Sequence, residues 1–299
     1  MAQAKIGLFT FSGTGNTAMV ADMLKSAFAE KGATVENYNI EKIQRDGERP
    51  DMASFDYIGI GYPIHAFNEP PIVTRWIKAL SKSSGQKSFI FKTAGEPFFA
   101  NNVSSCRMIH LLKQKGYRNI FERHFLMPYN IMFRYPDGLV KQMVLTSEKL
   151  ANHMAGAILA GEIHIQDYSL YTRINGMVFR FLKNYGVALN GKFFHISKKC
   201  THCMKCVREC PVQNIHYDGR KFRFGWKCML CMRCAMRCPA GAVKMSVLTP
   251  WVLVGEYDFK RIMADPRIGG DFVNKKTRGY FRLFRKYFEW ADEETAISK

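Results

Sequence analysis

The sequence predicts an α/β protein in which a doubly wound, five-stranded parallel sheet precedes a small α+β domain. Two observations lead to this prediction. Short apolar segments alternate with amphipathic segments through the first half, as strands do with crossover helices. Eight of the nine cysteines then form two copies of one pattern. We expect a sheet domain, a basic connector, a cysteine-rich domain and a basic aromatic extension, at 1–165, 166–192, 193–249 and 250–299.

The elements of the sheet domain follow from hydrophobic periodicity. A first strand is expected at Lys5–Thr10, and a helix at Ala18–Glu30 follows it after a glycine loop rich in hydroxyls. A sheet of this class binds its ligand beyond the carboxyl ends of the strands, where the strand order reverses. The remaining strands are expected at about 34–39, 57–62, 87–93 and 119–127, and the helices at about 71–80, 105–115 and 139–160.

The loop after the first strand has the composition of an anion site. Backbone N–H groups at a helix start, together with three hydroxyls, can surround a phosphate without Lys or Arg. A dinucleotide fingerprint also fits, because Gly13-x-Gly15-x-x-Ala18 is followed by Glu36, and a purely structural turn is a third interpretation. Three hydroxyls in six positions favour a terminal monophosphate. A Walker phosphate loop is excluded because no Gly-Lys-Ser/Thr follows the glycines. The expected phosphate residues are Thr10, Ser12, Gly13, Thr14, Gly15, Asn16 and Thr17.

The string S-x-T-G-N-T at Ser12–Thr17 resembles the phosphate loop of flavodoxins. The resemblance implies FMN as the ligand, held also by loops 61–70 and 93–102 at the same edge of the sheet. The aromatic spacing there differs from that of short-chain flavodoxins and resembles a subfamily fused to a ferredoxin module. Packing at the sheet edge is the alternative role for each aromatic residue. The expected ring-binding residues are Tyr62, Pro63, Ile64, His65, Ala66, Phe67, Thr93, Ala94, Gly95 and Phe99.

The cysteine pattern indicates iron–sulfur chemistry. It reads C-x2-C-x2-C-x3-C-P from Cys200 and recurs from Cys228, an offset of 28 residues (228−200). A C-x2-C-x2-C loop places three thiolates around one corner of a cubic cluster, and the fourth comes from elsewhere. Zinc favours paired C-x2-C knuckles. Disulfides need an oxidising compartment, and we expect no signal peptide at this N-terminus that would direct the chain to one. Disulfides are therefore the less favoured interpretation of the cysteines.

The duplicated segment resembles bacterial ferredoxins with two 4Fe-4S clusters, over about 55 residues. The resemblance implies that the Cys before each Pro binds the cluster of the other repeat. One cluster is then expected on Cys200, Cys203, Cys206 and Cys238, and the other on Cys228, Cys231, Cys234 and Cys210.

Two apolar helical stripes have no cofactor motif. One runs along Ser169–Tyr185, and the other includes Tyr280, Phe284 and Phe288 beside basic residues. Each can pack against protein or lie on a membrane surface. The formal charge of +19 favours acidic redox partners of the ferredoxin or flavodoxin type, or anionic lipid. Dispersed basic residues without a recognition motif argue against nucleic acid.

A flavin that accepts two electrons and clusters that accept one together predict an electron-transfer protein. We expect a cytoplasmic relay of low-potential electrons in an anaerobe, with no catalytic residues. The alternatives are an FMN-dependent oxidoreductase that reduces a quinone or flavin, and a membrane-docked subunit of a redox complex. The titratable groups of the flavin loops are His65, Glu69 and Glu96. A homodimer in which flavin and cluster meet between chains also stays open.

Overall fold

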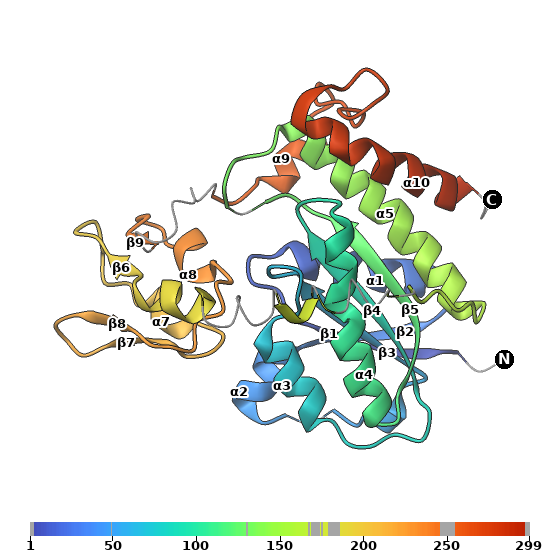
Figure 1. The fold of residues 1–299 in the computed structure, drawn as a ribbon, viewed down its shortest axis with the longest axis horizontal. Coiled ribbons are helices and arrows are strands. Elements are labelled where there is room, and N and C mark those ends of the chain that lie inside the picture. Colours follow the sequence, from blue (N-terminus) through green and yellow to red (C-terminus); the bar gives the residue numbers. More distant parts are fainter. Residues whose placement is uncertain are drawn as a thin grey trace.

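The computed structural model describes residues 3–48, 50–129, 131–166, 168, 174, 176–178, 186–245 and 255–296. Its first domain is built on five parallel strands in the order β2-β1-β3-β4-β5 (Figure 1). This is the flavodoxin-like order, so the predicted doubly wound sheet is confirmed. The order reverses between β1 and β3, which marks the ligand-binding edge. The strands are β1 Lys5–Thr10, β2 Thr34–Asn39, β3 Tyr57–Pro63, β4 Lys87–Ala94 and β5 Arg118–Leu126.

Helices cover both faces of this sheet because successive strand residues point to opposite sides. In β1, Leu8 packs under α1 and α5, whereas Phe9 packs under α2, α3 and α4. The short α2 was not predicted. Asn39 caps it by accepting hydrogen bonds from the backbone of Glu41 and Lys42, and Gly47 ends it at φ 74°. The elements are α1 Asn16–Glu30, α2 Ile40–Asp46, η1 Met52–Ser54, α3 Pro71–Ala79, η2 Phe99–Ser105, α4 Cys106–Gln114 and α5 Asp137–Leu159.

The small domain repeats its backbone as well as its cysteines. Helix α8 begins 28 residues after α7 (233−205). Three pairs of residues with positive φ keep the same offset, for example Met204 at 57° and Met232 at 60°. Two antiparallel strand pairs flank the helices, β6 with β9 and β7 with β8. The bounds are β6 His195–Ile196, α7 Lys205–Arg208, β7 Ile215–Tyr217, β8 Phe222–Phe224, α8 Arg233–Met236 and β9 Val243–Lys244.

The C-terminal segment packs on the first domain, where α10 lies beside α5 (Figure 1). Phe284 and Phe288 are buried in a cluster with Leu139 and Met143 of α5, so much of this stripe faces protein. The elements are α9 Phe259–Ala264, η3 Gly279–Phe284 and α10 Arg285–Ala296. Most of the stripe at Ser169–Tyr185 lies outside the described residues. Within the described part of the chain, no helix combines the length and apolarity needed to cross a bilayer.

Candidate functional site

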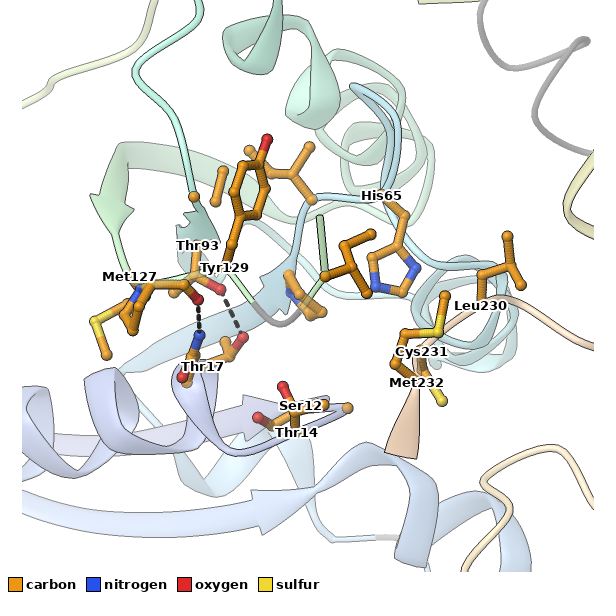
Figure 2. A pocket seen from close by; sticks show the side chains of 18 residues that line it. Ser12, Thr14, Thr17, His65, Thr93, Met127, Tyr129, Leu230, Cys231 and Met232 are labelled. Atoms are coloured by element: carbon orange, nitrogen blue, oxygen red, sulfur yellow. Dashed lines mark hydrogen bonds between the residues drawn. The ribbon is translucent and has the colours of Figure 1, made fainter. Parts of the chain in front are cut away.

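A cleft opens at the carboxyl edge of the sheet, where the strand order reverses. Four segments of the first domain converge there, from the ends of β1, β3, β4 and β5, and residues 230–232 of the small domain close one side (Figure 2). The cleft therefore belongs to both domains. The predicted residues that line it are Ser12, Gly13, Thr14, Asn16, Thr17, Pro63, Ile64, His65, Thr93, Ala94 and Gly95.

The loop before α1 is held in shape by its own polar side chains. The backbone N–H of Gly15 donates to Ser12 Oγ at 3.1 Å, and Asn16 Nδ2 donates to the carbonyl of Pro128 at 2.9 Å. The hydroxyls of Thr17 and Thr93 share a 2.8 Å hydrogen bond. No side chain caps α1, so the N–H groups of its first turn are available to an anion. Gly15 has φ 118°, a conformation that favours glycine.

Some predicted residues lie elsewhere. Thr10, Gly15, Ala66 and Phe67 are not among the residues that line the cleft, although Gly15 shapes the loop. The side chain of Phe99 lies outside the described part of the chain.

The expected role of Tyr62 as a ring-binding residue is corrected by its position. On β3, Ile58, Ile60 and Tyr62 share the face that packs under α3, because alternate residues of a strand point the same way. The Tyr62 side chain is fully buried, and its hydroxyl lies 3.5 Å from Ser104 Oγ. Burial raises its pKa well above the ordinary value. Tyr62 is therefore a core residue and does not border the cleft.

The loop after β5 contributes to the cleft and was missed. Met127, Pro128, Tyr129 and Ile131 line it. The Tyr129 ring lies where a Cβ on Gly95 would come within 2.4 Å of it, so Gly95 is needed for this approach. No motif marks this loop. The only available signal was its place at the carboxyl end of a strand next to β4.

The three titratable groups of the flavin loops differ in their surroundings. His65 lines the cleft (Figure 2). Glu69 accepts a hydrogen bond from Thr74 Oγ1 at 2.9 Å and pairs with Arg107 at 3.4 Å. Glu96 accepts hydrogen bonds from the hydroxyls of Tyr129 and Tyr280. The two carboxylates are thus engaged in structural contacts.

Two further cavities lie in the small domain, each walled by four cysteines. Matching backbone N–H groups donate to sulfur in the two repeats, from Asn214 to Cys210 Sγ and from Ala242 to Cys238 Sγ, both at 3.2 Å. Each cavity takes its fourth cysteine from the other repeat, the exchange that the ferredoxin resemblance implies. The first cavity has Cys210, Cys228, Cys231 and Cys234, and the second has Cys200, Cys203, Cys206 and Cys238.

The donor set of these cavities fits a cubic cluster. Among the described residues, no three His, Cys, Asp or Glu side chains are grouped tightly enough for one metal ion, so the thiols surround a space and do not converge on a point. Burial raises the pKa of Cys231 to about 12 and that of Cys228 to about 11. Bound iron would stabilise the thiolates that burial disfavours.

Arg233, the first residue of α8, joins the small domain to the phosphate loop. Its Nε donates to the carbonyl of Gly13 at 2.9 Å, and its Nη2 donates to that of Ser12 at 2.8 Å. Its Nη1 forms a buried ion pair with Glu41 at 2.7 Å. A Cβ on Gly13 would lie 2.8 Å from the carbonyl oxygen of Cys231. Cys231 therefore borders both the sheet-edge cleft and the first cysteine cavity.

Comparisons with known proteins agree with this division of the chain. The family model for the 4Fe-4S dicluster domain matches residues 192–239. A comparison with curated proteins found no match. The chain thus joins a flavodoxin-like sheet domain, assigned from its strand order, to an iron–sulfur domain.

Solved structures similar to the first domain include three proteins of known source. The NAD(P)H:quinone oxidoreductase of Methanothermobacter marburgensis is 14% identical, with a TM-score of 0.42, over 56% of this chain and 100% of that one. The Bacillus cereus flavodoxin 1 is 16% identical, with a TM-score of 0.36, over 50% and 95%. The Megasphaera elsdenii flavodoxin is 25% identical, with a TM-score of 0.33, over 40% and 84%.

Proposed function

We propose that this chain holds one FMN in the sheet-edge cleft and two 4Fe-4S clusters, and that it relays electrons through them between redox partners. The observation that carries this proposal is the position of Cys231, which lines both the cleft and a cysteine cavity. When bound, a flavin exchanges two electrons and each cluster one. The shared wall gives the two cofactors a short route within one chain.

The cleft offers the groups that a flavin mononucleotide requires. Ser12, Thr14 and the first turn of α1 would hold the phosphate. The backbone at residues 63–65 and 93–95, together with the Tyr129 ring, would enclose the flavin ring. The hydroxyl-rich loop favours a terminal phosphate over a dinucleotide bridge.

The two cluster sites then have different tasks. The proximal site, defined by Cys210, Cys228, Cys231 and Cys234, borders the cleft. The distal site, defined by Cys200, Cys203, Cys206 and Cys238, includes Cys203, which is the exposed one among the eight. An exposed ligand brings a cluster close to a docked protein. The proposed order is therefore FMN, proximal cluster, distal cluster and partner, with electrons free to run in either direction.

Electron transfer is favoured over reduction of a small substrate. Substrate reduction needs an accessible flavin and a proton donor. Glu69 and Glu96 are committed to neighbouring side chains, which leaves His65 as the one titratable side chain of the flavin loops that lines the cleft, and residues 230–232 cover part of that cleft. A membrane-docked role has less support, because Phe284 and Phe288 are buried. Acidic ferredoxin-type or flavodoxin-type partners and a cytoplasmic location remain part of the proposal.

Cofactor counting under anaerobic conditions tests this function. We expect about one FMN and about eight iron atoms per chain, because each cubic cluster holds four irons. Titration with dithionite should consume about four electrons, two for the flavin and one for each cluster. Chromatography of the released flavin separates FMN from FAD. Bound zinc without iron, or a dinucleotide in place of FMN, would contradict the proposal.

A further inference from the structure

A fourth cavity, of about 340 Å³, lies at the outer edge of β5, under the C-terminal segment. Its volume falls within the usual range of small-molecule sites. None of the residues that line the flavin cleft lines this one. The walls come from β5, from η3 and α10, and from five loop and 3-10 residues, Pro97, Phe98, Asn102, His164 and Gln166.

A buried cation with unused donors lies on the wall of this cavity. Arg123 is 3% exposed, and its Nη2 donates to Glu294 Oε1 at 2.8 Å. Its Nε and Nη1 have no partner among the described residues. The guanidinium carbon lies 5.5 Å from the centre of the Trp290 ring. Buried N–H donors are rarely left without an acceptor. The unused donors of Arg123 are therefore available to an acceptor on a bound ligand.

The other polar groups of the lining indicate the charge of a ligand that would accept from Arg123. His124 Nε2 and Gln166 Oε1 are also buried without partners in the described structure. The carboxylate on the wall, Glu122, is occupied by Lys92 at 3.3 Å and by the hydroxyls of Ser105 and Tyr168. Lys286 is exposed and also lines the cavity. Gln166 Oε1 can only accept a hydrogen bond, so the preference for a negatively charged ligand comes from the unused N–H donors of Arg123 and from Lys286.

The remaining walls favour a ligand with an apolar, flat body. Phe98, Leu283 and Trp290 line the cavity. We propose that this cavity binds a small organic carboxylate, with the carboxylate on Arg123 Nε and Nη1 and the apolar body against these side chains. Lys286 attracts the anion at the entrance. This site is independent of the flavin and of the clusters, so its test does not depend on the proposed function.

Titration calorimetry with benzoate tests the proposal on the purified full-length protein. We expect saturable binding at about one site per chain. Benzyl alcohol, which keeps the ring without the charge, should not bind measurably. Inorganic phosphate, which has charge without an apolar body, should bind at least tenfold more weakly. The absence of saturable benzoate binding, or equal binding of the alcohol, would overturn the proposal and indicate that the cavity holds water only.

Substitutions locate the binding. Arg123→Met keeps the length of the side chain and should weaken benzoate binding at least tenfold. Lys286→Ala should weaken it several-fold, whereas Arg282→Ala, which removes an exposed basic residue that does not line the cavity, should leave it unchanged. If Arg123→Met does not fold, Leu283→Trp fills the cavity without a change of charge and should abolish binding. Unchanged affinity in the folded Arg123→Met and Leu283→Trp variants would overturn the assignment.

Discussion

Arg233 shows how one residue couples the two domains. It donates to the carbonyl oxygens of Ser12 and Gly13. In a trans peptide the N–H points away from the carbonyl, so the N–H groups of Gly13 and Thr14 are directed away from Arg233. The iron–sulfur domain thereby orients the loop that is proposed to hold the FMN phosphate. Glu41 neutralises the buried guanidinium, so the contact depends on an intact pair.

Arg233→Ala should weaken FMN binding by about tenfold or more and leave riboflavin binding nearly unchanged, because riboflavin has no phosphate. Loss of one partner from a buried pair should also lower the free energy of unfolding by about 3–5 kcal/mol. Flavin fluorescence titration and urea denaturation measure the two effects. Arg237→Ala is the matched control, because Arg237 is 38% exposed and pairs with Glu209 at 3.4 Å. Equal losses of FMN and riboflavin would point to a purely structural role for Arg233.

A second residue-scale prediction concerns acid stability. Burial and the nearby Lys92 charge lower the pKa of His124 from 6.5 to about 3. Between about pH 6.5 and pH 3, the His124 side chain therefore binds a proton in the unfolded chain but not in the folded chain. This contribution is fully present above pH 6.5 and is lost as pH falls toward 3, by about 1.4 kcal/mol per pH unit.

Urea denaturation at pH 7.5 and pH 5 checks this sign. When the pH is lowered from 7.5 to 5, protonation of His124 in the unfolded chain should lower the free energy of unfolding by about 2 kcal/mol, since pH 5 lies about 1.5 units below the ordinary pKa. His124→Gln should remove that part of the pH dependence. The same loss in both proteins would mean that His124 is protonated in the folded state.

At the scale of elements, strands were predicted well because period-2 apolar runs between polar turns are local signals. The bounds of the five strands of the parallel sheet lie within one residue of those expected from the sequence. Helix α2 was missed because its seven residues are too few for a clear period. Tyr62 was assigned to the flavin site and Tyr129 was missed, because the neighbours of residues near a strand end depend on tertiary structure. Tyr62 is the last residue but one of β3 and has its side chain in the core, whereas Tyr129 lies in a loop after β5 that no motif marks.

Helix–cluster packing gives an element-scale prediction. Residues 186–192 are helical, and a Cβ on Gly191 would lie 2.0 Å from Cys228 Cβ and 2.5 Å from its Sγ. Gly191→Ala should therefore displace a ligand of the proximal cluster and reduce iron from about eight toward about four per chain. Gly186→Ala is the matched control, because no atom of the described residues beyond its own helix lies within 4 Å of its added Cβ. Iron analysis and electron paramagnetic resonance measure the outcome. Full iron content in Gly191→Ala would contradict this packing.

For the whole molecule, the formal charge of +19 predicts how partners approach. Reduction of an acidic ferredoxin should slow by about tenfold or more from low to physiological salt, because the Debye length shortens to about 8 Å. Exchange between cofactors inside the chain should not respond. Stopped-flow mixing of the reduced protein with an acidic and a basic acceptor tests both statements. Equal rates for the two acceptors would contradict electrostatic steering by the basic surface.

The central claim is that the flavin site exchanges electrons with the cluster of Cys231 inside one chain. Flash reduction of the flavin, followed by its reoxidation at several protein concentrations, tests this most directly. Cys203→Ser should remove the distal cluster, and Cys231→Ser the proximal one. We predict a rate independent of protein concentration that persists in Cys203→Ser and disappears in Cys231→Ser. A rate proportional to concentration, or one that survives in Cys231→Ser, would contradict the claim.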